Sequence, residues 1–119
     1  MMGINISDRG ERFTDLILAG VKTVETRASR SLDSVIGKRV GIVRTGRGTA
    51  TLVATATVGS PVRYGSPAEF RAAYQHHRVA EGSRFDCTSA GKWGYPLVAV
   101  EPVEPRTVTS RGIVLRRID

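Results

Sequence analysis

Residues 20–27 hold the side chains best suited to chemistry. They read Gly-Val-Lys-Thr-Val-Glu-Thr-Arg, and the β-branched residues at alternate positions predict a strand that begins at Thr23. Alternate strand residues share a face, so Thr23, Glu25 and Arg27 point the same way. Lys22, where the strand begins, can swing its ammonium towards that face. A face of hydroxyl, carboxylate and guanidinium suits a binding surface better than a core.

Lys22 and Glu25 support two kinds of chemistry. A lysine within reach of a carboxylate can act as an acid–base pair if burial lowers its pKa. The same pair can instead serve as a donor and an acceptor that read a base or a phosphate. An ordinary ion pair within a sheet is the structural alternative. The residues alone leave these three interpretations open.

The positive charge is concentrated near this segment. The chain has 18 Lys and Arg against 11 Asp and Glu, a formal charge of +7, and seven of the basic residues fall in residues 22–47. Such a concentration attracts a polyanion. We therefore expect phosphate contacts from Arg39, Arg44 and Arg47, and from the arginines near the C-terminus. A solvated basic surface without a partner is the alternative.

Other residues carry weaker signals. Trp93 could stack a base or pack in the core, and its glycine neighbours favour the rim of a cleft. His76 and His77 are adjacent, so on a helix they diverge; we expect His77 to pack on the apolar face, with no metal site and no cofactor. Cys87 is the single cysteine, which suits a small buried thiol and a reducing compartment, so we expect a cytoplasmic protein.

Length and composition exclude several classes of protein. The 119 residues, 40% of them hydrophobic, predict one globular domain over residues 1–119. No apolar run approaches the roughly 20 residues of a membrane helix, so we expect no membrane partner. The glycine-rich phosphate loop and the Gly-x-Ser-x-Gly nucleophile motif are both absent from the sequence. The oligomeric state stays open.

Periodicity and capping signals predict the secondary structure. A helix over residues 8–20 begins with Asp8 and Glu11 in a capping-box pattern, and Ser66-Pro67-Ala68-Glu69 starts a second helix. Strands are expected at residues 23–27, 40–45, 49–58, 95–101 and 112–118, with prolines at 102 and 105 ending the fourth. Because hairpins rather than helical crossovers link the strands, we expect an α+β fold, a small, mostly antiparallel barrel with two flanking helices.

The segment that follows the first helix resembles the signature of ASCH domains, a branch of the PUA-like superfamily. That signature is Gly-x-Lys-x-x-Glu-x-Arg, and Gly20, Lys22, Glu25 and Arg27 match its four fixed positions. The resemblance spans roughly residues 4–118. It implies a PUA-like β-barrel with a cleft beside the motif strand, and RNA or a modified nucleoside as the partner. The residues then expected to bind the ligand are Lys22, Thr23, Glu25, Arg27, Arg39, Arg44, Arg47 and Trp93.

The same resemblance implies an enzymatic alternative. Some compact ASCH proteins look like hydrolases that remove an acyl group from modified cytidine with a Lys-Thr-Glu set, and one is described as a ribonuclease. On this chain the lysine falls on Lys22, the threonine position falls on Glu25, and the distal acid is Glu81 or Glu69. As an enzyme, the protein would use Lys22, Glu25 and Glu81. A non-catalytic partner-binding module is a third hypothesis.

Overall fold

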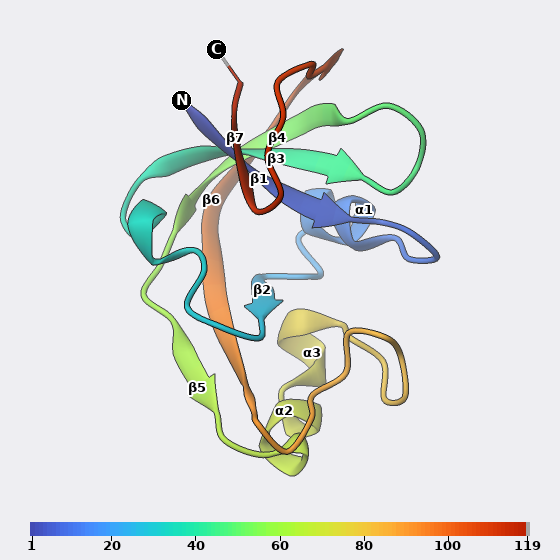
Figure 1. The fold of residues 1–119 in the computed structure, drawn as a ribbon, viewed down its shortest axis with the longest axis vertical. Coiled ribbons are helices and arrows are strands. Elements are labelled where there is room, and N and C mark those ends of the chain that lie inside the picture. Colours follow the sequence, from blue (N-terminus) through green and yellow to red (C-terminus); the bar gives the residue numbers. More distant parts are fainter. Residues whose placement is uncertain (119) are drawn as a thin grey trace.

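A computed structural model describes residues 1–118, in which seven strands form one curved sheet (Figure 1). The strand order is β2-β6-β4-β3-β1-β7, and β5 pairs with β6 beside this path. The strands are β1 (Met2–Ser7), β2 (Val24–Arg27), β3 (Arg39–Thr45), β4 (Thr51–Val58), β5 (Val62–Tyr64), β6 (Lys92–Thr107) and β7 (Leu115–Arg117). The helical elements are α1 (Phe13–Leu18), the 3-10 turn η1 (Asp33–Val35), α2 (Pro67–Ala72) and α3 (Tyr74–His77).

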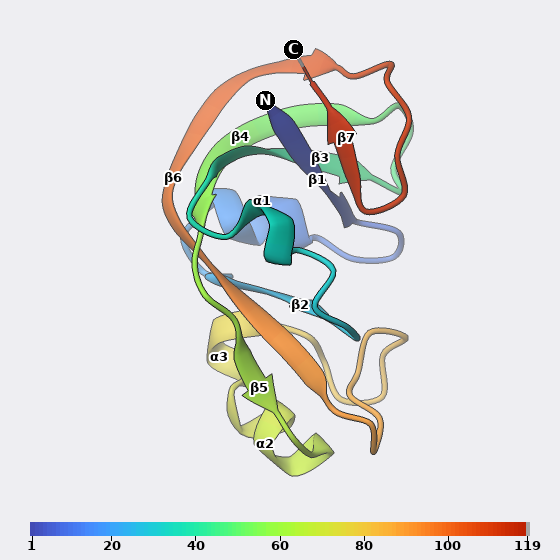
Figure 2. The same cartoon turned by 60° about the vertical axis from the view of Figure 1, so that its left-hand side comes forward.

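The sheet curls into a half-open barrel, and the long strand β6 joins two parts of the molecule. In Figure 2, β6 runs from the upper layer of β1, β3, β4 and β7 down to the lower part, where β2, β5, α2 and α3 lie. The β1–β3 pair is parallel, and the other strand pairs in residues 1–118 are antiparallel. The expected α+β architecture with a mostly antiparallel sheet is confirmed.

Strand β6 corrects one expectation about its length. Prolines 102 and 105 were expected to end a strand near residue 101, yet β6 continues to Thr107. Its register with β4 shifts twice, between Leu52 and Ala54 and between Thr55 and Thr57, and Ala99 adopts a φ of 51°. Pro105 falls within the first of these shifts, where extra residues of one strand have no ladder partner, whereas Pro102 stays in register opposite Ala54.

The two expected helices form, although the first is shorter. The α1 helix begins at Phe13, and Asp8 still fastens it because its Oδ1 accepts a 3.1 Å hydrogen bond from the Thr14 amide. The α2 helix begins as expected, with Ser66 Oγ accepting from the Glu69 amide at 3.2 Å. The strands β1 and β5 were not expected. In β1 four successive residues are buried, so the alternation that identifies a half-buried strand is missing.

The core fills the concave side of the sheet, and one of its members is a lysine. Ile4, Ile17, Phe70 and Tyr95 are fully or almost fully buried, and so is Lys22 at 1% exposure. His77 packs in the core as expected, with its ring stacked on Phe70 at a centroid distance of 4.0 Å. Within residues 1–118, none of the helices is long and apolar enough to cross a membrane.

Candidate ligand-binding cleft

A cleft of about 400 Å³ opens beside the free edge of β2. Its walls come from β1, β2, the segment between α3 and β6, and the segment before β7, and they include Ser7, Glu25, Thr26, Arg27, Arg84 and Lys92. A pocket of about 30 Å³ adjoins it and is lined by Lys22, Phe13 and several of the same residues. The larger volume lies within the range of small-molecule sites, and the smaller one can hold a water molecule.

Lys22 directs its three ammonium protons at three acceptors. Nζ donates to the carbonyl oxygens of Val24 at 2.8 Å and His77 at 2.7 Å, and it lies 3.4 Å from Glu25 Oε1. The ring of Phe13 lies beneath it, 4.7 Å from Nζ to the centroid. Burial lowers the pKa of Lys22, and the adjacent Glu25 carboxylate opposes that shift. The lysine therefore ties β2 to α3 and meets the cleft only through Glu25.

Glu25 is held between two cations where the cleft meets the small pocket. Its Oε2 lies 2.9 Å from Arg27 Nη2, while its Oε1 faces Lys22. Arg27 Nη2 also donates to the Asn5 carbonyl at 2.6 Å, which links β2 to β1 across the cleft. Arg27 Nε is buried and has no hydrogen-bond partner within residues 1–118. A buried donor without an acceptor carries a free-energy cost.

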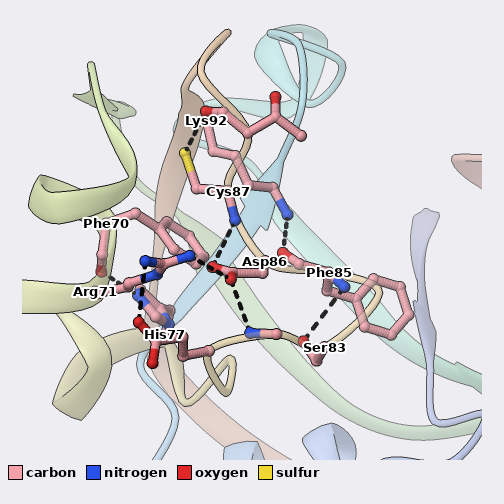
Figure 3. Close-up of polar contacts among 11 residues, drawn as sticks. Phe70, Arg71, His77, Ser83, Phe85, Asp86, Cys87 and Lys92 are labelled. Atoms are coloured by element: carbon pink, nitrogen blue, oxygen red, sulfur yellow. Dashed lines mark hydrogen bonds and ion pairs between the residues drawn. The ribbon is translucent and has the colours of Figure 1, made fainter.

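Lys92 enters the cleft from the start of β6. It is 8% exposed, and its Nζ donates to the Phe85 carbonyl at 2.6 Å (Figure 3). Burial lowers the pKa of Lys92, and the Glu25 carboxylate opposes that shift. Lys92 thus supports the Phe85 backbone and adds positive charge near Glu25.

Asp86 fastens the segment that carries Arg84 and Phe85. Its carboxylate accepts from Arg71 Nη2 at 2.9 Å and from the amides of Gly82 and Cys87, both at 2.8 Å (Figure 3). These donors, the Arg71 guanidinium first, lower the pKa of Asp86 to about 2. The cleft wall is therefore a loop fixed to α2, with Arg84 exposed on it.

Positive charge dominates the cleft. Glu25 is the one carboxylate among the described lining residues, whereas the cleft and its adjoining pocket are lined by the cations Lys22, Arg27, Arg84 and Lys92. An anionic ligand is attracted to such a site. Because an ionised carboxylate only accepts hydrogen bonds, Glu25 favours a ligand that also presents a donor. Among residues 1–118, no group of His, Cys, Asp and Glu is arranged to hold a metal ion.

The structure brings together Lys22, Glu25 and Arg27, the three charged residues of the motif. Thr23 precedes β2 and is exposed, whereas Thr26 lines the cleft. Glu81 is 70% exposed and pairs with Arg71 at 2.9 Å. Glu69 accepts from the Gly65 amide at the start of α2. Neither candidate distal acid lies in the described lining of the cleft.

The remaining predicted residues lie outside the described cleft lining. Arg39 donates to the Ala99 carbonyl at 2.6 Å and contacts Glu101 at 3.5 Å. Arg47 lies 3.8 Å from Asp15. Arg44 is half-buried in β3, and its Nε has no partner within residues 1–118. Trp93 is partly buried in β6.

Sequence reasoning missed Thr26, Arg84 and Lys92 as cleft residues. Alternation along a strand places Thr26 on the opposite face from Glu25. However, β2 is an edge strand and its backbone edge faces the cleft, so consecutive residues can line the same cleft. Lys92 stands beside Trp93 and Gly91, a weak signal. Arg84 lies in a segment without periodicity, and no sequence signal would have identified it.

The fold matches solved ASCH structures. An ASCH protein from Zymomonas mobilis superposes with a TM-score of 0.64 at 17% identity, covering 89% of this chain and 72% of that chain. A serine-to-alanine variant of that protein superposes with a TM-score of 0.70 at 22% identity, covering 89% of this chain and 72% of that chain. A tyrosine-to-phenylalanine variant superposes with a TM-score of 0.66 at 19% identity, covering 89% of this chain and 74% of that chain. No protein-family model and no curated protein matches the sequence. The chain has an ASCH-type fold, as the signature implied.

Proposed function

We propose that the protein binds RNA or a nucleotide in the cleft beside β2. The observation that carries this proposal is the position of Glu25, fixed between Lys22 and Arg27 at 3.4 and 2.9 Å. The surrounding cations attract phosphate, while the carboxylate accepts a hydrogen bond from a base or a sugar. A site that bound only polyanions would gain nothing from a buried carboxylate, so this pair of features favours a nucleotide.

Arg84 and Arg27 are the residues proposed to contact phosphate. Arg84 is exposed on the cleft wall, and Arg27 lies between the cleft and β6. A guanidinium can form two parallel hydrogen bonds to a phosphate, which gives both affinity and orientation. Lys92 is proposed to contribute mainly its charge, because its Nζ already supports the Phe85 carbonyl.

Fluorescence anisotropy with a labelled single-stranded RNA at low salt tests this proposal. Arg84→Ala should weaken binding roughly tenfold, since a charge-assisted bond contributes about 1.5–3 kcal/mol. Lys38→Ala is the matched control, because Lys38 lines a separate hollow with Met1 and Val35, and its loss should change affinity less than about twofold. Equal effects of the two variants, or no binding of RNA and nucleotides by the unaltered protein, would contradict the proposal.

Hydrolysis of an acylated nucleoside is the second candidate function, and the small pocket favours it. Its lining brings Ser7, Lys22, Glu25 and Thr26 around a space the size of a water molecule. Two of the Lys22 protons are held by carbonyl oxygens, and the third is directed at Glu25, so Lys22 would hold that carboxylate at the pocket. Glu25 would take a proton from the attacking water and pass it to the leaving amine.

Release of cytidine from N4-acetylcytidine tests this second candidate. Glu25→Gln should abolish release, because the amide cannot accept the proton from water. Lys22→Ala should also abolish it, and circular dichroism would establish that each variant is folded. Release at an unchanged rate by a folded Lys22→Ala or Glu25→Gln protein would exclude this mechanism.

A further inference from the structure

Trp93 lies beneath two guanidinium groups outside the cleft. The Cζ atoms of Arg30 and Arg63 lie over its ring, 5.0 and 5.2 Å from the centroid. Arg63 extends from β5, directly opposite Trp93 in the ladder with β6. Arg30 follows β2, and its side chain is 52% exposed. The partly buried indole of Trp93 therefore contacts two guanidinium groups that come from two different segments of the chain.

Both guanidinium groups are fixed by further contacts. Arg30 Nε binds Asp33 Oδ2 at 2.7 Å, and the other oxygen of Asp33 accepts from the Tyr95 hydroxyl at 2.6 Å. Arg63 Nη2 donates to the Ala90 carbonyl at 2.8 Å. Because Arg30 is held through Nε, its two Nη groups are left to point at a ligand. Fixing a side chain in advance lowers the entropy cost of binding.

Arg27 connects this cluster to the cleft. In the β2–β6 ladder Arg27 is directly opposite Trp93, so their side chains leave the sheet on the same face. The guanidinium of Arg27 reaches Glu25 and the Asn5 carbonyl in the cleft. Figure 2 shows β2, β6 and β5 side by side in the lower part of the molecule. Arg27 thus links the cleft, through the pairing of β2 with β6, to Trp93 and the two arginines over its ring. This line of basic residues from the cleft to Arg30 and Arg63 is called the path below.

We infer that Arg30, Trp93 and Arg63 form a phosphate clamp for a single-stranded RNA that extends out of the cleft. This inference rests on the proposed function and names its ligand class, an oligonucleotide rather than a free nucleoside or mononucleotide. The cleft holds one nucleotide, Arg27 guides the backbone over the edge of β2, and the clamp binds the phosphates that follow. A guanidinium over an aromatic ring can still direct its unoccupied N–H groups at phosphate oxygens.

The clamp suits a single strand better than a duplex. The path begins in a cleft of about 400 Å³, which has room for one nucleotide and not for a base pair with its stacked neighbours. Aromatic and basic side chains that alternate along a groove are typical of single-strand sites. The clamp contacts phosphate and leaves the bases to the cleft, so little sequence preference is expected beyond the first nucleotide.

The fluorescence of Trp93 provides a direct test, because it is the single tryptophan in the chain. The unaltered protein is titrated with uridine 5′-monophosphate and with oligouridylates of up to about eight nucleotides. We expect the affinity to rise at least tenfold from the mononucleotide to about four nucleotides. We also expect Trp93 fluorescence to change with the oligonucleotides only, because only they reach the clamp.

Arg30→Gln and Arg63→Gln separate the clamp from the cleft. Each should weaken oligonucleotide binding several-fold, leave mononucleotide binding unchanged, and reduce the slope of log affinity against log salt by about 0.7. Lys38→Gln is the charge-matched control and should change neither ligand's affinity. Equal affinity for the mononucleotide and the longer chains would overturn the clamp and leave the cleft site intact. No binding of either ligand would overturn the proposed function itself.

Discussion

The Lys22 ammonium lies 3.4 Å from the Glu25 carboxylate, and both side chains are almost fully buried. The pair joins two roles in one contact. Lys22 satisfies the carbonyl oxygens of Val24 and His77, which secures β2 against α3. Glu25, while paired with Lys22, also lines the cleft. Changes to either residue are therefore expected to alter both the stability of the fold and the binding of a ligand.

Glu25→Gln should destabilise the protein by about 3–5 kcal/mol at neutral pH, because it leaves the buried Lys22 ammonium without its counter-charge. Urea unfolding measures the loss. Glu104→Gln is the matched control, since Glu104 is exposed, and it should cost no more than about 0.5 kcal/mol. A loss for Glu25→Gln as small as that of the control would mean that the ion pair does not stabilise the fold.

His77 predicts a loss of stability in mild acid. Its Nδ1 accepts from the Val79 amide at 2.9 Å, so Nε2 must carry the proton and donate to the Phe70 carbonyl at 2.6 Å. Burial lowers the pKa of His77 below 6.5, and the bond to Phe70 opposes that shift. Below pH 6.5 the unfolded chain binds more protons than the folded one, so stability falls as the pH drops towards the folded pKa.

Urea unfolding between about pH 8 and pH 5 checks this expectation for His77. His76→Gln should leave the pH profile unchanged, because His76 is exposed, whereas His77→Phe should flatten it. Long-range nitrogen–proton NMR spectra identify the tautomer. A proton on Nδ1 at neutral pH, or an unchanged profile in His77→Phe, would refute the assignment.

Asp86 predicts a second loss of stability at lower pH. Its pKa is lowered from 3.8 to about 2, first by the Arg71 guanidinium. The stabilisation is therefore present above pH 3.8 and disappears as the pH falls towards 2. Asp86→Asn should remove this contribution, which is seen as the difference between the two unfolding profiles. Identical acid profiles would show that the carboxylate does not fasten the loop. Asp33, whose pKa the Tyr95 hydroxyl also lowers, is present in both proteins, so its contribution cancels in the difference.

A variant of Arg39 tests whether the affinity for RNA comes from the cleft or from the basic segment at residues 22–47. Arg39→Gln should lower the free energy of unfolding by about 1–2 kcal/mol, because the guanidinium bonds to Ala99 and Thr55 are lost. Its affinity for RNA should stay within about twofold of the unaltered protein. A large loss of affinity with unchanged stability would instead assign phosphate binding to the outer face of β3.

The sequence predicted those site residues that lie close together along the chain. Lys22, Glu25 and Arg27 lie within six residues, so one strand signal and one motif were enough to place them together. Lys92 and Arg84 reach the same cleft from about sixty residues further on. Their position in the cleft depends on the pairing of β2 with β6 and on the loop that Asp86 fastens. The periodicity of hydrophobic residues in the sequence predicts neither feature.

The fold was predictable where each element carries its own signal. Ser66 and Pro67 fix the start of α2, and the glycines at 46 and 48 mark the β3–β4 turn. The prolines at 102 and 105 predicted an early end to β6, which was wrong. Whether a strand accommodates them depends on its register with β4, which the sequence does not reveal. The position of a charge in the sequence likewise does not determine where its side chain points. Arg39 lies near the motif in the sequence, but it points at Glu101 on β6 rather than into the cleft.

Chemical-shift mapping with a short single-stranded RNA shows directly whether RNA binds in the cleft beside β2. In nitrogen–proton correlation spectra of the labelled protein, we expect the largest shifts on the amides of Ser7, Thr26, Phe85 and Lys92 around the cleft. Smaller shifts should follow at Trp93 and Arg63 when the RNA is several nucleotides long. Shifts confined to the outer face of β3 and β4, or no shifts at low salt, would show that RNA does not bind in the cleft.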